Sequence, residues 1–186
     1  MSEWVTAFAP ASIGNVAVGF DMLGLALEGV GDRVQARRCD GEGMRIAEVR
    51  GLDGQLHPYL STDAESNTAS IAAKALWDAQ GGQGGVELKV HKGVPLQSGM
   101  GSSAASAVAA VVAVNALLDA PLAPEKLLAY ALIGEQFASG GLHADNVAPS
   151  LLGGLVLCPQ VLLPEIVRVP VPQGVSAVLL HPDLQV

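Results

Sequence analysis

The sequence predicts an α+β fold, because strand patterns alternate along the chain with longer helical ones. Half of the 186 residues are hydrophobic and only 15% are charged, which suits a well-buried core. The strand patterns are those of antiparallel strands with one wet face, and the helices are expected to cover one side of the sheet. A chain of this length holds one sizeable domain, or one domain and part of a second.

Composition excludes several classes of protein. A formal net charge of −8 argues against a nucleic-acid surface, which requires clustered Lys and Arg, although a few local donors and a metal ion can still hold ATP. Cys39 and Cys158 are too few for a disulfide framework or a metal knuckle. No apolar run reaches the roughly 18 residues of a membrane span, and residues 1–10 lack the pattern of a secretory signal. We therefore expect a cytoplasmic protein without a membrane partner.

The first strand is predicted over Val5–Phe8 and is expected to end at Pro10. A turn, ASIGN, and the apolar stretch GFDMLGLAL follow. Asn15 and Asp21 are the polar residues here, and they either bond nearby backbone in Asx turns or contact a ligand. Residues 33–49 then alternate as antiparallel strands do.

A loop containing His57, expected to be exposed, precedes an amphipathic helix that stops at the glycines 81 and 82. Asn67 is the expected N-cap of this helix. The next strand, around residues 86–90, leads into Lys92. That lysine is interpreted either as an exposed residue of an edge strand or as a cation close to a bound phosphate.

The stretch PLQSGMGSSA, residues 95–104, connects this strand to an Ala/Val-rich helix. The first N–H groups of a helix lack intrahelical partners and carry partial positive charge, so an anion is their natural ligand. Gly99 and Gly101 let the backbone approach a phosphate, and Ser102 and Ser103 add hydroxyls for phosphate or Mg²⁺. The stretch matches neither a Walker loop nor G-x-G-x-x-G. Its interpretation is a phosphate-binding loop, with a simple turn into a core helix as the alternative.

Two helices follow this loop. The first is predicted over Ser102–Leu118, and the second begins at Pro124 and ends at Gly140. Glu135 lies on the apolar face of the second helix, where a carboxylate is expensive to bury without a partner. We expect Mg²⁺ as that partner, and a backbone hydrogen bond on a less buried face is the alternative.

Residues 143–149, HADNVAP, are predicted as a loop, and the following LLGGLVLC as a strand. His143, Asp145 and Asn146 form a polar cluster in this loop. Ordinary turn chemistry and a ligand site both explain such a cluster.

The character of the sequence changes after Cys158. A Pro-rich junction over 164–172 and a new strand over 175–180 indicate a domain boundary. We therefore divide the chain into a domain over 1–163 and the beginning of a second domain over 164–186.

Three stretches together resemble the GHMP kinase superfamily. PLQSGMGSSA is similar to its P-x-x-x-G-L-G-S-S-A motif, with Met100 where Leu is usual. Ala9–Leu27 and His143–Gly154 resemble two conserved blocks of the homoserine kinase family, and on these motifs the chain is identified as a member. The resemblance implies the GHMP kinase N-terminal fold, a ribosomal-protein-like mixed sheet backed by helices. It also implies a second α+β domain, of which this chain would hold only the first strand, so activity of the chain alone is in question.

The resemblance implies ATP-dependent phosphorylation of the L-homoserine hydroxyl, a step of threonine biosynthesis, with ATP and Mg²⁺ as cofactors. To the nucleotide it assigns Pro95, Leu96, Gln97, Ser98, Gly99, Met100, Gly101, Ser102, Ser103, Ala104, Asn67 and Lys92. To the metal it assigns Ser102, Ser103 and Glu135, and to the amino acid Asn15, Asp21 and His143. Asn15, Asp145 and Asn146 are the catalytic candidates, with Asp145 and Asn146 placed to orient the attacking hydroxyl.

Two alternatives stay open. One is another GHMP kinase, acting on mevalonate, galactose or an isopentenyl-type substrate. The other is a non-catalytic module that binds a nucleotide or a partner protein. Strand edges left exposed by a missing second domain would also favour a homodimer.

Overall fold

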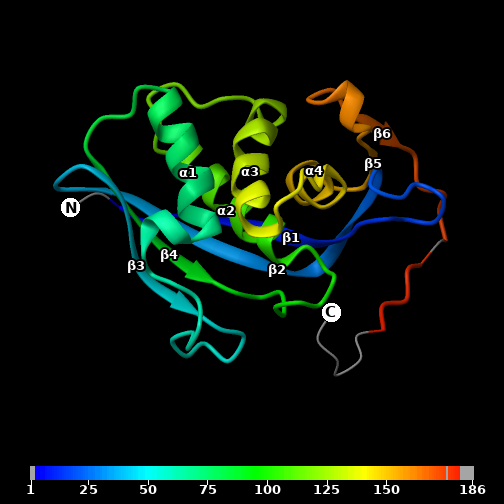
Figure 1. The fold of residues 1–186 in the computed structure, drawn as a ribbon, viewed down its shortest axis with the longest axis horizontal. Helices are drawn as coiled ribbons and strands as arrows, with labels where there is room; N and C mark the ends of the chain where they lie inside the picture. Colours follow the sequence, from blue (N-terminus) through cyan, green and yellow to red (C-terminus); the bar gives the residue numbers. More distant parts are fainter. Residues whose placement is uncertain (1–2, 175, 181–186) are drawn as a thin grey trace.

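The computed structural model describes residues 3–174 and 176–180. These residues form one six-stranded mixed sheet with the helices on one face (Figure 1). The strands are β1 (Val5–Ile13), β2 (Leu23–Cys39), β3 (Gly43–Arg50), β4 (Gly85–His91), β5 (Leu155–Leu157) and β6 (Val167–Val169). The helices are α1 (Thr68–Ala79), α2 (Ser102–Asn115), α3 (Pro124–Ser139) and α4 (Ala144–Leu152), with 3₁₀ turns at Ala64–Ser66 and Gln160–Leu162. The predicted α+β fold is confirmed.

The sheet is organised around the long strand β2. β1 pairs with one edge of β2 over most of its length. The opposite edge is shared by two strands, because β4 pairs with Arg33–Cys39 and β5 with Leu23–Leu25. β3 extends the sheet beyond β4, and β6 extends it beyond β5. On this edge, the residues of β2 between Leu25 and Arg33 have no strand partner among the described residues. The segment that follows β4 passes beside them.

Two strand predictions need correction. β1 does not end at Pro10 but continues to Ile13, since β1 is an edge strand and its register shifts between Pro10 and Ser12. A proline without an N–H is tolerated at such an edge and bulge. Residues 33–49 contribute to two strands as predicted, but β4 lies between these strands and β3 pairs with β4 in parallel.

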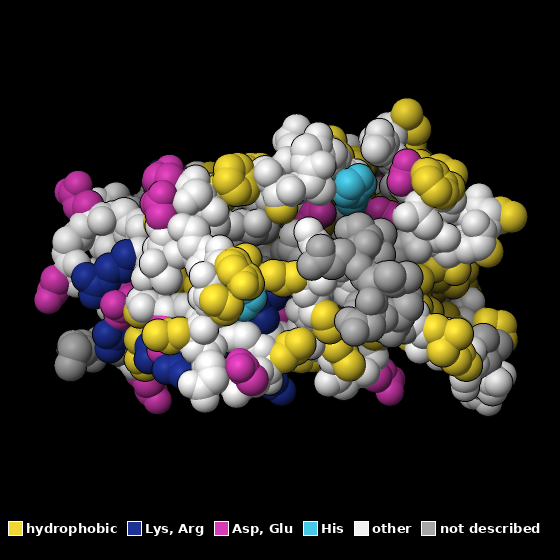
Figure 2. All heavy atoms as spheres, turned by 60° about the horizontal axis from the view of Figure 1, so that its bottom comes forward, with side chains coloured by type: hydrophobic (Ala, Val, Ile, Leu, Met, Phe, Trp, Pro, Cys, Tyr) yellow, Lys and Arg dark blue, Asp and Glu magenta, His cyan; other side chains and the backbone are white. Residues whose placement is uncertain are grey.

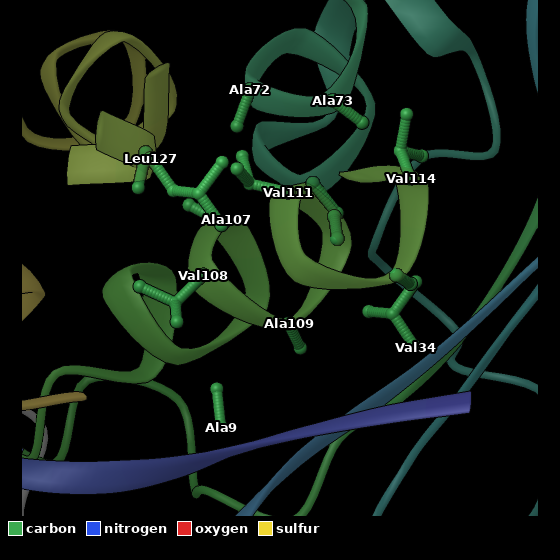
Figure 3. Close-up of a cluster of buried hydrophobic side chains, with 14 of the residues drawn as sticks. Ala9, Val34, Ala72, Ala73, Ala107, Val108, Ala109, Val111, Val114 and Leu127 are labelled. Atoms are coloured by element: carbon green, nitrogen blue, oxygen red, sulfur yellow. The ribbon is translucent and has the colours of Figure 1, made fainter. Parts of the chain in front are cut away.

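The core is centred on α2. This helix packs on β1 and β2 with one side and against α1 and α3 with the other. Ala109 points toward Ala9 and Val34, whereas Val111 lies toward α1 and the labelled Leu127 (Figure 3). A helix that is apolar around its circumference belongs in the interior, and small side chains let its neighbours approach closely.

Helix α2 ends at Asn115, before the predicted Leu118. The Asn115 side chain donates to the Leu122 carbonyl at 3.0 Å and accepts from the Leu122 N–H at 2.8 Å. These two bonds hold the turn that follows, so the chain leaves the helical path although its residues remain apolar.

The C-terminal predictions were partly wrong. β6 lies inside the Pro-rich junction expected over 164–172 and pairs with β5. Residues 176–180 have no regular structure where a strand was predicted, and residues 175 and 181–186 lie outside the described part. The boundary between residues 163 and 164 stays a prediction.

Basic and acidic side chains gather together over the end of the sheet formed by β3 and β4 (Figure 2). Glu87 binds both Arg37 and Arg45, and a second acidic side chain, Glu48, pairs with Arg50. These arginines are therefore paired with carboxylates on the same surface. Across the described residues, no helix combines the length and apolarity needed to cross a membrane.

Both cysteines are free thiols. Cys158 is fully buried, and its thiol donates to the Met22 carbonyl at 3.1 Å. Burial raises the pKa of this thiol to about 12. Cys158 therefore acts as a packing residue that ties β5 to the start of β2.

Candidate active site

The glycine loop, defined here as residues 93–101, joins β4 to α2 and bends sharply. Gln97, Gly99 and Gly101 have positive φ angles of 53°, 69° and 65°, a region that favours glycine because glycine lacks a Cβ. Gly101 is the N-cap of α2, and no side chain caps this helix end. The first N–H groups of α2 are thus left for an external partner, and the helix dipole favours an anion.

The glycine loop forms one wall of a cavity of about 1000 Å³. Segments far apart in the sequence contribute the other walls: the turn before β2, the residues before α1, and the facing ends of α3 and α4. The predicted site residues that line this cavity are Asn15, Asp21, Asn67, Lys92, Pro95, Leu96, Gln97, Ser98, Gly99, Gly101, Ser102, Ser103, Glu135, His143, Asp145 and Asn146. The fold therefore brings together nearly all of the predicted site.

Two predicted residues, Met100 and Ala104, do not line the cavity. Met100 is 7% exposed and belongs to a small apolar cluster with Ala11, Val94 and Ala105. Ala104 is buried in the main core. Both side chains therefore anchor the loop and the start of α2, and a contact of the nucleotide with their backbone stays a prediction.

Asn67 is the N-cap of α1, as predicted. Its side-chain oxygen accepts from Ala69 N at 3.0 Å, and its amide nitrogen donates to the Ser61 carbonyl at 2.8 Å. Both ends of the carboxamide are thus engaged by the protein. A contact between Asn67 and a nucleotide stays a prediction.

His57 is half-buried rather than exposed. Its Nδ1 accepts from the Leu60 N–H at 3.0 Å and the Tyr59 N–H at 3.2 Å, and all three residues line the cavity. This fixed turn gives the cavity a partly apolar wall. Sequence reasoning missed the wall because nothing in the local pattern connects this loop with the glycine loop.

Glu135 lies at the carboxyl-terminal end of α3 and is only 3% exposed. Its Oε1 is 3.7 Å from Nδ1 of His143, while its buried Oε2 has no hydrogen-bond partner among the described residues. The predicted burial on the apolar helix face is therefore confirmed. An unpartnered buried carboxylate oxygen requires a cation or a donor from outside the chain.

The HADNVAP segment is not a loop, because residues 144–152 form helix α4 with His143 as its N-cap. Asp145 in the first turn accepts from Asn15 N through Oδ2 at 2.9 Å, while its buried Oδ1 has no partner among the described residues. Asp145 is thus a second carboxylate with one oxygen engaged and one open. The polar residues and Pro149 suggested a turn, but Pro149 is accommodated inside the helix.

The turn between β1 and β2 is held in a strained form. Asn15 and Asp21 have φ angles of 55° and 56°, and Asp21 N donates to Asn15 Oδ1 at 2.9 Å. The local backbone bond expected of an Asx residue is therefore present. Both side chains still line the cavity, so the structure also leaves room for a ligand contact.

Ser12 is a fully buried residue that sequence reasoning missed. Its N–H donates to the Met100 carbonyl at 3.0 Å, and its Oγ donates to Asn146 Oδ1 at 3.0 Å. A Cβ on Gly101 would lie 2.4 Å from Ser12 Oγ. Ser12 therefore fastens the glycine loop to the first turn of α4.

Lys92 is neither exposed nor on an edge strand. It is 7% exposed and follows β4, which has strand neighbours on both sides. Its ammonium group binds the fully buried Asp32, the Ser102 carbonyl at 2.8 Å and Ser106 Oγ at 2.7 Å. Burial lowers the pKa of Lys92, although the charge of Asp32 works in the opposite direction. Asp32 and Ser106 were not predicted, since their partners lie far away in the sequence.

The comparison with protein families agrees with this geometry. The family model described as GHMP kinases N terminal domain matches residues 67–154, which contain the glycine loop, Glu135 and Asp145. These residues are therefore a GHMP kinase N-terminal domain, and the fold expected from the sequence motifs is confirmed.

Over nearly its whole length, the chain is a relative of homoserine kinases. It is 50% identical over 177 residues to the homoserine kinase of Xanthomonas campestris pv. campestris (strain B100), a match that covers 95% of this chain and 53% of the relative. The homoserine kinase of Xylella fastidiosa (strain M12) is 51% identical over 177 residues, with the same coverage of 95% and 53%. The chain spans about half the length of the curated relatives it matches.

Solved structures give the same result. The homoserine kinase of Cytophaga hutchinsonii matches with a TM-score of 0.84 at 44% identity, covering 92% of this chain and 53% of that one. The mevalonate kinase of Methanococcus jannaschii matches with a TM-score of 0.67 at 12% identity, covering 91% of this chain and 56% of that one, and this likeness shows the fold alone.

Proposed function

We propose that the cavity transfers the γ-phosphoryl group of ATP to the side-chain hydroxyl of L-homoserine, forming O-phospho-L-homoserine and ADP. The observation that carries this proposal is the arrangement of the cavity. An uncapped helix N-terminus and a glycine loop face it, and two buried carboxylates, Glu135 and Asp145, each leave one oxygen without a partner. The relatives that match nearly the whole chain are homoserine kinases.

The nucleotide phosphates are assigned to the glycine loop and the start of α2. A Cβ on Gly99 would meet no atom within 4 Å, so Gly99 borders open space where a phosphate can approach the backbone. Ser102 Oγ donates to the Val94 carbonyl at 3.1 Å and closes the base of the loop. The loop is thus held in shape before a ligand arrives, which lowers the entropic cost of binding.

The residues present fit a magnesium ion. Glu135 supplies a buried, unpartnered carboxylate oxygen, and the Ser103 hydroxyl makes no hydrogen bond to any described residue. Ser102 keeps lone pairs in addition to its donated proton. Mg²⁺ is usually held by one or two protein oxygens together with phosphate oxygens and water, and it would neutralise the charge of the phosphates. The described residues contain no group of three or more His, Cys, Asp or Glu side chains that could hold a metal ion among themselves.

The acceptor is assigned to the opposite side of the cavity. Asp145 is held by its bond to Asn15 N, and its free Oδ1 would accept a hydrogen bond from the attacking hydroxyl and so orient it. Asp21 offers a carboxylate for the ammonium group of homoserine, and His143 offers a donor for its carboxylate. Phosphoryl transfer needs positioning and charge stabilisation more than a strong base, so no strong base is assigned.

Three further assignments depend on this function. A cytoplasmic location and a place in threonine biosynthesis go with the proposed product. The boundary between 1–163 and 164–186 goes with a family in which a second domain completes the substrate site. Exposed strand edges favour a homodimer as the form of the isolated chain.

The test is homoserine-dependent release of ADP, measured on this chain and on this chain fused to the segment of the Xanthomonas campestris homoserine kinase that it does not match. Mevalonate and galactose serve as alternative acceptors. We expect turnover with homoserine in the fused protein. Turnover with mevalonate or galactose instead would assign the cavity to another GHMP kinase. ATP binding without turnover on any acceptor would leave the non-catalytic module.

A further inference from the structure

Asp32, Lys92 and Ser106 form a buried polar network directly beneath the glycine loop. The last residue pair between β2 and β4 is Arg33 with His91, after which the chain leaves the sheet edge. Gly93 then passes so close to β2 that a Cβ on it would lie 2.0 Å from the Gly31 carbonyl oxygen. The glycine loop therefore begins in contact with the middle of β2, at the edge where no described strand pairs with it.

The Asp32 carboxylate replaces the missing strand partner at this point. Its Oδ1 accepts from the N–H groups of Gly93 at 2.8 Å and Val94 at 3.1 Å. Its Oδ2 accepts from Ser106 Oγ at 2.5 Å and from the Lys92 ammonium group. Asp32 is fully buried, and four donors surround it. A carboxylate with this many donors holds the groups around it in fixed directions.

Lys92 connects the same network to the other end of the loop. Besides Asp32, its ammonium group binds the Ser102 carbonyl at 2.8 Å and Ser106 Oγ at 2.7 Å. Its three donors are therefore engaged inside the protein. The network thus contacts the first two residues of the glycine loop and the first turn of α2, which are the two ends that set the shape of the loop.

Stability alone does not explain this network. A buried ion pair is often no more stable than apolar residues of the same volume, since both charges lose their hydration. The rest of the α2 surface is packed with Ala and Val, so an apolar solution was open at this position too. The charged network adds directional hydrogen bonds. These bonds fix the orientation of backbone amides and carbonyls, which apolar contacts do not.

We infer that Asp32 is a positioning residue for the glycine loop, acting through Lys92 and the backbone without touching the nucleotide itself, and that Ser106, which also lines the cavity, belongs to the same positioning network. This inference rests on the proposed binding of ATP by that loop. It predicts that weakening the network loosens the loop and lowers the affinity for ATP by more than the loss of folding stability explains.

The first test compares Ser106→Ala with Ser150→Ala. Both serines are buried in helices, but Ser106 lines the cavity, whereas Ser150 donates a single bond to the Pro10 carbonyl at 2.7 Å and does not line it. Hydrogen exchange measured without ligand therefore separates positioning from a direct contact of Ser106 with ATP. We expect both variants to lower Tm by similar amounts. Only Ser106→Ala is expected to weaken ATP binding in the presence of Mg²⁺, by roughly threefold to tenfold, the equivalent of one lost hydrogen bond. Equal ATP affinity in the two variants would overturn the inference.

The second test separates charge pairing from positioning. Asp32→Asn leaves Lys92 buried without its counter-ion, so this variant is expected to be unstable. Adding Lys92→Met removes that charge as well and is expected to recover the Tm. The double variant lacks the donor to the Ser102 carbonyl, so its ATP affinity should stay at least threefold below wild type. Recovery of both Tm and affinity would show a purely structural pair.

A hydrogen-exchange measurement without ligand keeps the inference independent of the proposed function. Ser106→Ala is expected to reduce amide protection at Gly93, Val94 and Ala105, whose N–H groups are hydrogen-bonded without ligand, while Ser150→Ala leaves these amides unchanged. Failure of the wild-type chain to bind ATP would refute the proposed function but not this result. Unchanged protection of the loop in Ser106→Ala would refute the positioning role, whether or not ATP binds.

Discussion

Gly99 and Gly101 occupy the same loop with nearly the same backbone angles, yet replacing each by alanine should have different consequences. Their φ angles are 69° and 65°, so both alanines would enter the left-handed region at a cost of roughly 1–2 kcal/mol. At Gly99 the new Cβ would meet no atom within 4 Å. The cost of Gly99→Ala in the free energy of unfolding should therefore be about 1–2 kcal/mol and arise from the backbone alone.

At Gly101 the new Cβ would collide with Ser12. It would lie 2.4 Å from Ser12 Oγ and 3.0 Å from Asn146 Oδ1, so the serine hydroxyl must move. That movement breaks the 3.0 Å bond from Ser12 to Asn146, which adds about 0.5–1.5 kcal/mol. Gly101→Ala is therefore expected to cost about 1.5–3.5 kcal/mol in total.

Urea denaturation of both variants measures this difference, provided that the slope of the transition stays that of the wild type. A Ser12→Ala background supplies the control, since alanine removes the hydroxyl that causes the collision. In that background Gly101→Ala should cost about as much as Gly99→Ala. Equal costs for the two glycines in the wild-type background, or no relief from Ser12→Ala, would refute the packing described for this junction.

Three other predictions test separate parts of the structure. Asp145→Asn keeps an oxygen for Asn15 N but loses the charge, so homoserine-dependent ADP release in the fused protein should fall roughly 100-fold with a nearly unchanged Tm; undiminished turnover would remove Asp145 from the site. Gly134→Ala places a Cβ 2.7 Å from the Thr68 carbonyl, so chemical denaturation should show a loss of about 1–3 kcal/mol from overpacking between α1 and α3, and a neutral effect would contradict that close approach. Burial alone raises the pKa of Glu87, but its bonds to Arg37 and Arg45 outweigh this and lower the pKa. Above the usual pKa range of a glutamate, Glu87 contributes its full stabilisation, and this stabilisation is lost as the pH falls through the lowered pKa. Glu87→Gln should therefore make Tm depend less on pH in the acid range.

The sequence predicted those features that local chemistry determines. Gly99 and Gly101 indicated a loop before the Ala/Val-rich helix, and the structure has that loop, with positive φ angles at both glycines. Pro124 and Gly140 marked the ends of α3, and the structure has Pro124 at the first helical position and Gly140 as the C-cap. These signals depend on one residue and its own backbone, and they can therefore be read without knowing the fold.

The features that the sequence did not predict depend on distant partners. The bond from Ser12 to Asn146 spans 134 residues, and the pair of Asp32 and Lys92 spans 60. No local pattern reports such distances. Lys92 was misread for the same reason, since alternation along β4 does not say that the strand has neighbours on both sides.

Helix α4 shows how a local signal can mislead. Polar residues and Pro149 are typical of turns, but here Asp145 and Asn146 are held by bonds to Asn15 and Ser12. Packing on β1 and β2 then stabilises a helix that the local sequence disfavours. The residues expected in a polar loop were thus the ones that connect the two sides of the cavity.

The most direct test of the central claim is the binding of ATP to this chain with and without Mg²⁺, compared between the wild type and Glu135→Gln. If the buried Oε2 of Glu135 helps to hold the metal beside the glycine loop, Mg²⁺ should tighten ATP binding by the wild type. Glu135→Gln should bind ATP alone as the wild type does and lose most of the gain from Mg²⁺. ATP binding that is indifferent to Mg²⁺ in the wild type, or an equal gain in both proteins, would contradict the assignment of this cavity to a metal-assisted phosphoryl transfer.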